Sequence, residues 1–507
     1  MRVILTSEEM READAYTIQT LGVPSLTLME NAGRALAEVA KVLSKGGDIL
    51  CLCGAGNNGG DGYACARFLK EDGFHVQCLA VEQPRSNDCK ATAQAWQQAG
   101  GMTYLKFPAS HKWALIVDCI FGTGFRGAFS DYALVEAIKN SGAKVLACDI
   151  PSGVNGDNGK VEDCAVLADV TLCLGEYKTG VYLQDGIDHA GQVLCADIGI
   201  KLPKENGEYA QMLTQADVRN LLPSRKRNTH KGSYGKAAIV AGSLAYSGAA
   251  HLSHTALFAT AACLRTGVGY TTLYVPKNLL SACMLKTPEA LLKSINDGDR
   301  YAFNEEKLQE LTAYSAVAFG MGMGQSEDVQ KGAAWLIANY QGKLILDADA
   351  INALALLPKE RLQALFAQKK CDVLLTPHVK EFSRLSGLSV AEILQNGARA
   401  AQSFAKQNKA TVLLKNAVTC IAHKNAVYVQ TCGCSGQAKG GSGDVLAGVI
   451  TGLAASGLSC VEAACVGSYL CGEAAEKAAE KLSEYAMLPS DIIAHLGAAF
   501  LSVLGQE

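Results

Sequence analysis

Residues 54 to 62 read Gly-Ala-Gly-Asn-Asn-Gly-Gly-Asp-Gly, with five glycines in nine positions. Glycine allows backbone turns that a Cβ atom would forbid, and the amides of such turns can face a phosphate or another anion. An apolar run over 48–53 precedes this stretch, and an alanine-rich helical pattern follows it from Tyr63. The order of strand, glycine loop and helix predicts a nucleotide site in a parallel sheet.

The rest of the chain repeats this alternation twice, which predicts two α/β domains. The strands expected in the first half are 48–53, 75–81, 114–118, 144–149, 170–174 and 192–196. Those expected in the second half are 236–241, 271–275, 316–320, 343–347, 372–376 and 411–415. The polar segment 201–209 interrupts the alternation, so we predict domains over residues 1–210 and 211–507. Thr6 and Glu9 have the spacing of a helix capping box.

Composition excludes several classes of protein. With 507 residues, 49% of them hydrophobic and 19% charged, the chain is expected to bury more than one core. A net charge of -3 offers no basic surface for nucleic acid, and no apolar stretch is long enough to cross a membrane. The 19 cysteines lie mostly in apolar runs, so we expect reduced thiols in a cytoplasmic protein. Metal binding by Cys51 and Cys53, or by Cys432 and Cys434, is the alternative.

Three loops of the first half follow strands and therefore meet at one edge of the predicted sheet: 57–62, 118–127 and 149–153. Oxygen atoms of Asn58, Asp118 and Ser152 could surround a hard cation. The glycine-rich loop 122–127, which includes Arg126, suits a phosphate, and Asp149 is left as the candidate acid or base. The alternative is that Asp118 and Asp149 only cap loops.

A dehydrogenase is a further alternative. Gly-x-Gly-x-x-Gly occurs at 54–59 and again at 122–127, and Glu82 could bind a ribose. Asn57, Asn58 and Asp61 argue against it, because a tight pyrophosphate turn usually has small apolar residues at such positions.

In the second half, residues 440 to 448 read Gly-Gly-Ser-Gly-Asp-Val-Leu-Ala-Gly. Glycines at the start of a helix expose amides that can bind an anion, and Asp444 would lie in the first turn. A carboxylate there could take a proton from a hydroxyl that attacks ADP or ATP. The alternative is an acidic helix cap. For Asp347 and Asp349, which could hold magnesium, capping of the next helix is the favoured interpretation.

The motifs of the first half resemble the NAD(P)H-hydrate epimerase domain over roughly two hundred residues. They are 54–62, 118–124, 149–153, 178–181 and 197–200. The resemblance implies a Rossmann-like doubly wound sheet, with Asp149 as the catalytic acid or base and a K⁺ ion bound by Asn58, Asp118 and Ser152. It implies substrate contacts from Asn57, Asn58, Gly59, Gly60, Asp61, Gly122, Thr123, Gly124, Phe125, Arg126, Gly127, Ala128 and Asp149.

The second half is similar to the ADP/ATP-dependent NAD(P)H-hydrate dehydratase domain of the ribokinase-like superfamily, an α/β/α fold. The matching segments are 241–250, 320–324, 346–354, 375–382, 412–419 and 440–448. The resemblance implies that Asp444 is catalytic and that the substrate contacts are Ala249, Gly322, His378 and Asp444. It implies nucleotide contacts from Lys415, Asn416, Ala417, Val418, Thr419 and Gly443. Met321, Val379-Lys380 and Asn416 depart from the usual Pro, Pro-Gly and Gly.

The two resemblances together imply a bifunctional repair enzyme for hydrated NADH and NADPH. The first domain would interconvert the R and S epimers, and the second would dehydrate the S epimer with ADP or ATP and Mg²⁺. We expect small-molecule substrates, no nucleic acid or membrane partner, and a homo-oligomer, a tetramer or larger. Two alternatives stay open at this point: a ribokinase-like small-molecule kinase, and a first half that only binds ligands.

Overall fold

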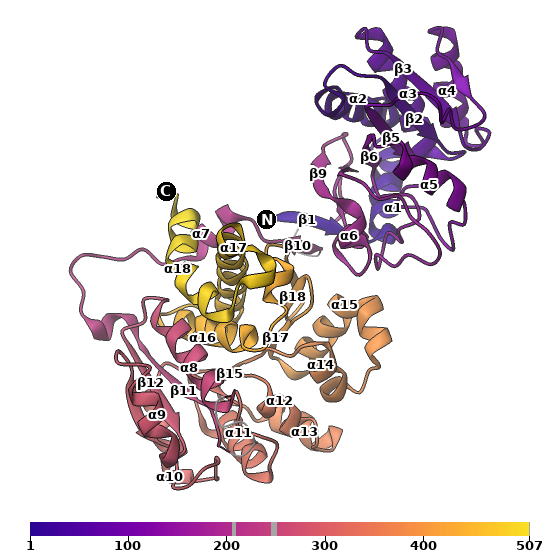
Figure 1. Cartoon of the computed structure of the whole chain (residues 1–507). Coiled ribbons are helices and arrows are strands. Elements are labelled where there is room, and N and C mark those ends of the chain that lie inside the picture. The colour runs from indigo at the N-terminus through magenta and orange to yellow at the C-terminus, as the bar shows by residue number, and fades with distance from the viewer. Residues whose placement is uncertain (205–208, 245–250, 506–507) are drawn as a thin grey trace. The chain divides into compact units, whose positions relative to one another are not determined.

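The chain folds into two compact units, which are described one at a time. The computed structural model describes residues 1–204, 209–244 and 251–505 (Figure 1). The first unit is Arg2–Ala210, and the second is Gln211–Glu507 together with Met1.

The first unit alternates strands and helices along nearly its whole length. Its strands are β1 (Arg2–Leu5), β2 (Ile49–Cys53), β3 (Val76–Ala80), β4 (Thr103–Tyr104), β5 (Leu115–Cys119), β6 (Lys144–Cys148), β7 (Val170–Leu174), β8 (Tyr177–Lys178) and β9 (Gln192–Ala196). Its α-helices are α1 (Ser7–Ala15), α2 (Ser25–Ser44), α3 (Asn57–Glu71), α4 (Asn87–Gln98), α5 (Tyr132–Asn140) and α6 (Gly186–Ala190). The predicted capping box is confirmed, since Thr6 and Glu9 bond each other's backbone at the start of α1.

Seven strands of this unit form one sheet in the order β4-β3-β2-β5-β6-β7-β9, and every pair in it is parallel. The chain runs from β2 to β3 and β4 in one direction and from β5 to β9 in the other. The direction of winding therefore reverses between β2 and β5, which is where doubly wound sheets bind ligands. The six predicted strands are confirmed. The short strands β1, β4 and β8 were not predicted, and β1 pairs in parallel with β8.

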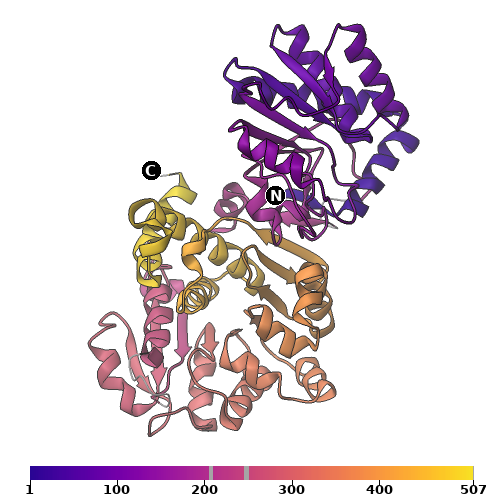
Figure 2. The ribbon, with the colours of Figure 1, turned by 45° about the vertical axis from the view of Figure 1, so that its right-hand side comes forward.

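Helices cover both faces of this sheet (Figures 1 and 2), and alternate residues of its strands serve two cores. Cys51 and Cys53 of β2 belong to the cluster that includes Leu36 of α2. Leu50 of β2 belongs to the opposite cluster, which includes Ile138 of α5. Burial on both faces explains why the strands read as continuous apolar runs rather than as alternating ones.

The glycine-rich stretch allows three segments to pack backbone against backbone. A Cβ atom on Gly54 would lie 2.0 Å from the carbonyl oxygen of Ile120, and one on Gly59 would lie 1.9 Å from that of Gly54. Neither position accepts a side chain. The loop after β2 and the first turn of α3 are thereby held directly against the loop after β5.

The second unit begins near strand β10 (Ala210–Met212) and helix α7 (Gln215–Leu221). Its other strands are β11 (Lys236–Val240), β12 (Tyr270–Val275), β13 (Leu291–Ser294), β14 (Ala316–Phe319), β15 (Lys343–Leu346), β16 (Asp372–Leu375), β17 (Thr411–Leu414), β18 (Thr419–His423) and β19 (Ala426–Gln430). Its other helices are α8 (His251–Leu264), α9 (Leu280–Met284), α10 (Glu305–Glu310), α11 (Glu327–Asn339), α12 (Asp349–Leu354), α13 (Lys359–Ala367), α14 (Val379–Ser386), α15 (Val390–Asn408), α16 (Ser442–Ala455), α17 (Cys460–Ala486) and α18 (Pro489–Leu504).

The sheet of the second unit runs β13-β12-β11-β14-β15-β16-β17-β18-β19-β10. From β13 to β17 it is parallel, and its winding reverses between β11 and β14. The six predicted strands are confirmed. The antiparallel hairpins β17–β18 and β18–β19 were not predicted.

Two clusters of buried side chains lie on the two faces of this sheet. One includes Ala256 of α8 and Val445 of α16, and the other includes Ala333 of α11 and Phe366 of α13. The second unit is therefore a three-layer α/β/α arrangement.

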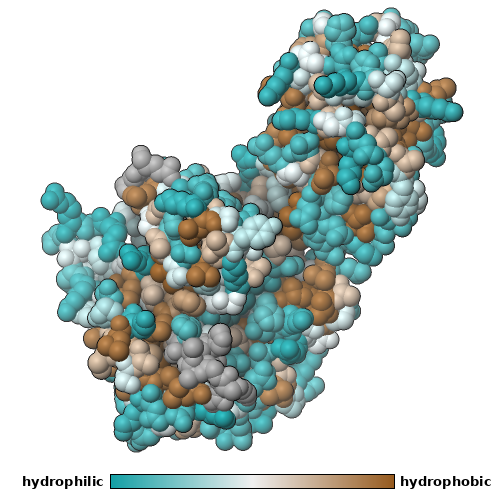
Figure 3. Space-filling model, viewed as in Figure 1, coloured by the Kyte–Doolittle hydropathy of each residue, from teal (hydrophilic) through white to brown (hydrophobic). Residues whose placement is uncertain are grey.

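The surface and the cysteine side chains can be compared with the composition, which predicted no membrane span and reduced thiols. No helix among the described residues is long and apolar enough to span a membrane. On the face drawn in Figure 3, hydrophobic residues form separate patches among hydrophilic ones. All 19 cysteines lie in described segments, and all are free thiols.

Candidate active sites

The first unit has a pocket of about 820 Å³ at the carboxyl ends of its strands. Its walls include the loops after β2, β5 and β6, so the three loops predicted to converge do so. Of the residues proposed to contact substrate, those that line the pocket are Asn57, Asn58, Asp61, Gly122, Thr123, Gly124, Phe125, Arg126, Ala128 and Asp149. Gly59 and Gly60 lie behind this wall, packed against Gly54 and Met29, and Gly127 is a turn residue with a φ of 88°.

Asp149 is held by a buried lysine. Lys178 is 0% exposed, and its Nζ lies 2.5 Å from Asp149 Oδ1. The backbone N–H of Leu174 donates to the same oxygen at 3.1 Å, and the Thr123 hydroxyl and backbone N–H donate to the other oxygen. Burial alone would raise the pKa of Asp149, but Lys178 and these hydrogen bonds outweigh it, so the pKa is lowered. Asp149 is therefore a fixed carboxylate and does more than cap a loop.

A second carboxyl, Asp61, lies in the same pocket without a hydrogen bond to any described residue. Its side chain does not cap α3, whose N-cap is Gly56 and has no side-chain hydrogen bond. Burial raises the pKa of Asp61 well above its usual value, and the neighbouring carboxyls of Asp149 and Asp14 add to the rise. Burial therefore favours the neutral form of Asp61, and a neutral carboxyl can donate a hydrogen bond.

Sequence reasoning missed one wall of this pocket, which helix α1 and the turn after it provide. The residues are Met10, Arg11, Asp14 and Ile18. They belong to no motif, and the only local signal at this helix was its capping box. Sequence reasoning also gave Lys178 no role.

Glu82, which a dehydrogenase would need for its ribose, pairs instead with Arg85 three residues further along the chain.

The oxygen atoms proposed to bind potassium lie beneath the pocket. The Ser152 hydroxyl donates to Asp118 Oδ1 at 2.6 Å and accepts from the Phe121 N–H at 2.9 Å. Asn58 Nδ2 is buried without a partner in the described structure, and Asn58 Oδ1 lies 2.8 Å from where a Cβ on Gly122 would be. Burial raises the pKa of Asp118 to about 6, although bonds from Ser152 and Ile120 oppose the rise. One carboxylate among neutral oxygens fits a monovalent cation.

In the second unit, helix α16 starts at Ser442 without a side-chain cap. Its N-cap is Gly441 in the left-handed conformation, with a φ of 104°. The first-turn amides are therefore available to an anion, and the Ser442 hydroxyl is buried without a partner in the described structure. Asp444 lies in this first turn but makes no capping bond, so the alternative of a simple helix cap is wrong.

Lys415 lies between Asp347 and the first turn of α16. Its Nζ lies 2.8 Å from Asp347 Oδ1 and 3.4 Å from where a Cβ on Gly443 would be. Asp347 also accepts from the Thr376 hydroxyl at 2.7 Å. Burial raises the pKa of Asp444 to about 7; Asp347 and Asp349 add to this rise and Lys415 opposes it.

The favoured interpretation of Asp347 and Asp349 as caps of the next helix is wrong. The N-cap of α12 is Ala348, which has no side-chain bond and a left-handed φ of 48°. Asp347 instead holds Lys415, and Asp349 accepts the N–H of Gly324 at 2.7 Å. Among the residues that the structure describes, no three His, Cys, Asp or Glu side chains are grouped to hold a metal.

The remaining predicted residues of the second unit lie in separate parts of it. His378 caps α14 by accepting two backbone N–H bonds at Nδ1, so it is more than a loop histidine, and its backbone bridges to Lys415. Gly322 has a φ of 62° and packs against Thr255. Asn416, Ala417 and Val418 form the turn before β18, which begins at Thr419. Ala249 lies outside the described residues.

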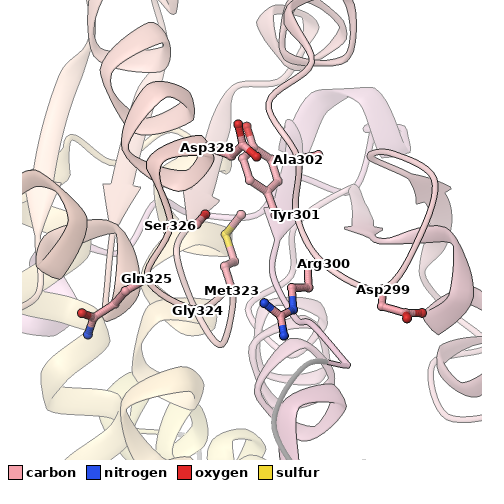
Figure 4. Close-up of a pocket in the computed structure, with 9 residues that line it drawn as sticks. All are labelled: Asp299, Arg300, Tyr301, Ala302, Met323, Gly324, Gln325, Ser326 and Asp328. Carbon is pink, nitrogen blue, oxygen red and sulfur yellow. The ribbon is translucent and has the colours of Figure 1, made fainter.

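A cavity of about 520 Å³ adjoins the turn that contains Gly322 (Figure 4). It is lined by Asp299, Arg300, Tyr301, Ala302, Met323, Gly324, Gln325, Ser326 and Asp328. Figure 4 shows the Tyr301 ring beside the Asp328 carboxylate. Gly324 joins this cavity to Asp349 through its N–H.

The fold and these sites define a two-unit α/β protein with one carboxyl-lined site in each unit. The family model described as NAD(P)H-hydrate dehydratase matches residues 237–497, and the one described as YjeF-related protein N-terminus matches residues 25–180. The chain belongs to the family of bifunctional NAD(P)H-hydrate repair enzymes. Its first unit is a doubly wound parallel sheet and its second is a three-layer α/β/α unit, as the sequence predicted.

Similar proteins cover nearly the whole chain. The bifunctional NAD(P)H-hydrate repair enzyme Nnr of Moorella thermoacetica is 32% identical over 97% of this chain and 95% of its own. That of Escherichia coli is 30% identical over 97% and 92%. Among solved structures, the ADP/ATP-dependent NAD(P)H-hydrate dehydratase of Bacillus subtilis, co-crystallized with ATP/Mg²⁺, is 28% identical, with a TM-score of 0.49 over 58% of this chain and 99% of that one.

We expect Lys178→Met to destabilise the first unit by about 3–5 kcal/mol, because it leaves Asp149 as a buried charge without its partner. The free energy of unfolding can be measured in urea by tryptophan fluorescence. A Trp335→Phe background leaves Trp96 and Trp113, both in the first unit, as reporters.

Lys160→Met is the matched control, since Lys160 forms an exposed pair with Glu162. Its loss should cost no more than about 1 kcal/mol. Equal losses in the two variants would contradict the structural role given to Lys178.

Proposed function

We propose that the two units carry out successive steps in the repair of hydrated NADH and NADPH. The first unit would interconvert the R and S epimers, and the second would dehydrate the S epimer with ADP or ATP. A stereospecific dehydratase alone would leave the other epimer unrepaired, which gives a reason for joining the two activities. Residues 1–210 and 211–507 are the proposed domains.

For the first unit, the fixed carboxylate of Asp149 is the proposed contact with the reacting end of the substrate. The substrate carries a hydroxyl on C6, next to the ring nitrogen N1, and epimerisation requires proton transfer with transient ring opening or iminium formation. An ionised Asp149 can accept a hydrogen bond from that hydroxyl and stabilise positive charge on the ring. The uncapped start of α3 and the loop around Arg126 suit the phosphates of the dinucleotide.

Asn58, Asp118 and Ser152 are the proposed ligands of a potassium ion. A bound cation would supply positive charge that keeps Asp118 ionised and would order the two loops that carry these residues. The buried Asp118 carboxylate, with the Ser152 hydroxyl 2.6 Å from its Oδ1, supports this assignment.

For the second unit, one observation carries the proposal: Asp444 has a pKa of about 7 and lies in the first turn of an uncapped helix. Such a carboxylate suits removal of the C6 hydroxyl proton while the oxygen attacks the terminal phosphoryl group of ADP or ATP. The phosphate ester that forms is then expelled by the N1 lone pair, and loss of a C5 proton restores NADH or NADPH. The other products are phosphate and AMP or ADP.

The first-turn amides of α16, with Gly443 and Lys415, are the proposed cradle for the nucleotide phosphates, and Asn416–Thr419 the contact for its adenosine. Gly322, His378 and Ala249 are the proposed substrate contacts. Mg²⁺ would neutralise the transferring phosphates, since it commonly binds through one or two carboxylates and substrate oxygens.

The compartment and the assembly are also proposals. The 19 free thiols suit a reducing compartment, so we propose the cytoplasm. A homo-oligomer, a tetramer or larger, stays a prediction.

An epimer-resolved assay tests both functions on the full chain. With ADP and Mg²⁺, we expect the wild type to convert R and S epimers of hydrated NADH to NADH, with formation of AMP. Asp444→Ala should abolish conversion of both epimers, since it lacks the base. Asp149→Ala should convert only the S epimer at the normal rate, once spontaneous epimerisation has been subtracted.

Two outcomes would contradict these proposals. A stable phosphorylated product without recovered NADH would indicate a small-molecule kinase. Undiminished conversion of the R epimer by Asp149→Ala would indicate that the first unit only binds ligands.

We expect dehydration to lose activity as the pH falls through about 7, because Asp444 must be ionised to act as a base and is protonated below that pH. The value of kcat/KM for the S epimer at saturating ADP should fall about tenfold per pH unit below the midpoint. Asp349→Asn removes a neighbouring negative charge and should move the midpoint to lower pH. A profile that is flat between pH 5.5 and 8 would contradict the role of Asp444.

Potassium should stabilise the first unit against urea, whereas sodium should not. Ligand binding at ten times Kd adds about 1.4 kcal/mol to the free energy of unfolding. The Trp335→Phe background reports this change, and Ser152→Ala should remove the difference between the two salts. Equal stability of the wild type in KCl and NaCl would contradict the potassium site.

A further inference from the structure

Helix α1 presents one face to the pocket of the first unit. Met10, Arg11, Asp14 and Ile18 recur at helical spacing and line the cavity, opposite the loops that carry the predicted motifs. Asp14 is the only acidic residue among them. It therefore places a carboxyl on a wall that none of the glycine-rich motifs contributes.

The Asp14 carboxyl has no hydrogen bond and no ion pair with any residue that the structure describes. Burial raises the pKa of Asp14 to about 6; Lys178 opposes the rise and Asp149 adds to it. Asp61 of α3 lines the same cavity, and the Asp14 carboxyl adds to the rise in the pKa of Asp61. The other charged residues that line this cavity are Arg11 of α1, Asp88 of α4 and Arg126.

Asp149, Asp61 and Asp14, three of the four carboxyls that line this pocket, differ in what they can do at neutral pH. Lys178, which lies 2.5 Å from Asp149, favours the ionised form of that carboxyl, whereas burial favours the protonated form of Asp61. Proton exchange is most effective in a group that can hold either state near the working pH. Only Asp14 of these three has that property, and no other interaction competes for its oxygen atoms.

We propose that Asp14 is the catalytic residue that exchanges a proton with the hydrated nicotinamide ring in the first unit. This inference rests on the proposed epimerase function and assigns the proton transfer, which the sequence predicted for Asp149, to Asp14. Asp149 then orients and stabilises the ring, while Asp14 moves the proton.

The step balances without any further reactant. One oxygen of Asp14 takes the proton of the C6 hydroxyl, and the oxygen electrons form the carbonyl double bond as the C6–N1 bond breaks. The electron pair of that bond goes to N1, which takes a proton back from Asp14. Rotation about the open chain exposes the other face of the aldehyde, and the reverse sequence closes the ring as the other epimer.

The test compares Asp14→Asn with the wild type in the full chain. Epimerisation, measured as conversion of the R epimer with enough added Asp149→Ala enzyme to consume the S epimer, should fall about 100-fold or more in Asp14→Asn. The pH dependence of the wild-type rate near 6 should disappear in the variant. Asp14→Glu should recover part of the rate.

Two controls separate catalysis from folding. Glu12→Gln removes an exposed carboxyl from the same helix, one that pairs with Lys204, and should leave epimerisation unchanged. Dehydration of the S epimer by Asp14→Asn itself should equal that of the wild type. Its stability in urea should not fall, because Asp14 has no bonded partner to lose.

Different outcomes would overturn the role of Asp14 and the proposed epimerase function of the first unit. A wild type that does not epimerise the substrate would overturn the proposed function. A wild type that does, together with an Asp14→Asn variant that keeps both the rate and the pH midpoint, would overturn the role of Asp14 alone.

Discussion

The site of the first unit depends on the buried pair of Lys178 and Asp149. A lysine with no exposed surface loses its hydration, so it requires a charged partner at hydrogen-bond distance. Asp149 meets this need from a left-handed backbone conformation, with a φ of 68°, which costs of order 1–3 kcal/mol outside glycine. The pair, with Thr123 and Leu174, fixes the end of β6 against β8 and the loop after β5.

The second unit repeats this arrangement with different residues. Lys415 binds Asp347 at the end of β15, and the next residue, Ala348, has a positive φ of 48°. In each unit a lysine fixes one carboxylate at the end of a central strand. A second carboxyl in the same site, Asp14 or Asp444, forms no hydrogen bond with a described residue, and burial raises its pKa to about 6 or about 7, respectively. Environments that separate the pKa values of neighbouring carboxyls assign them different chemical roles.

Much of both sites could be predicted because it lies in turns, whose sequences are constrained locally. Glycine at 54 and 59 is required by contacts with neighbouring backbone, and the strands of a parallel sheet are apolar throughout. Those signals predicted the fold class, and they predicted that the loops after β2, β5 and β6 form one site.

The residues that were missed owe their roles to contacts between distant parts of the chain. Asp14 is one polar residue on a helix with several, and only the packing of α1 distinguishes it from exposed Glu12. Lys178 and Asp347 read as ordinary residues near strand ends until their partners, 29 and 68 residues away, are known. The antiparallel hairpins after β17 were missed because their strands are only partly buried and so lack a continuous apolar run.

The pairing of β1 with β8 has a consequence for how the chain is made. Ile4 and Leu5 lie beside Tyr177 and Lys178, so β1 pairs with a strand that is synthesised about 170 residues later. Until β8 is synthesised, β1 has no strand to pair with, and Asp149 lacks its ion pair with Lys178. The seven-stranded sheet can begin to form during translation, but its catalytic pocket is among the last parts of the unit to be completed.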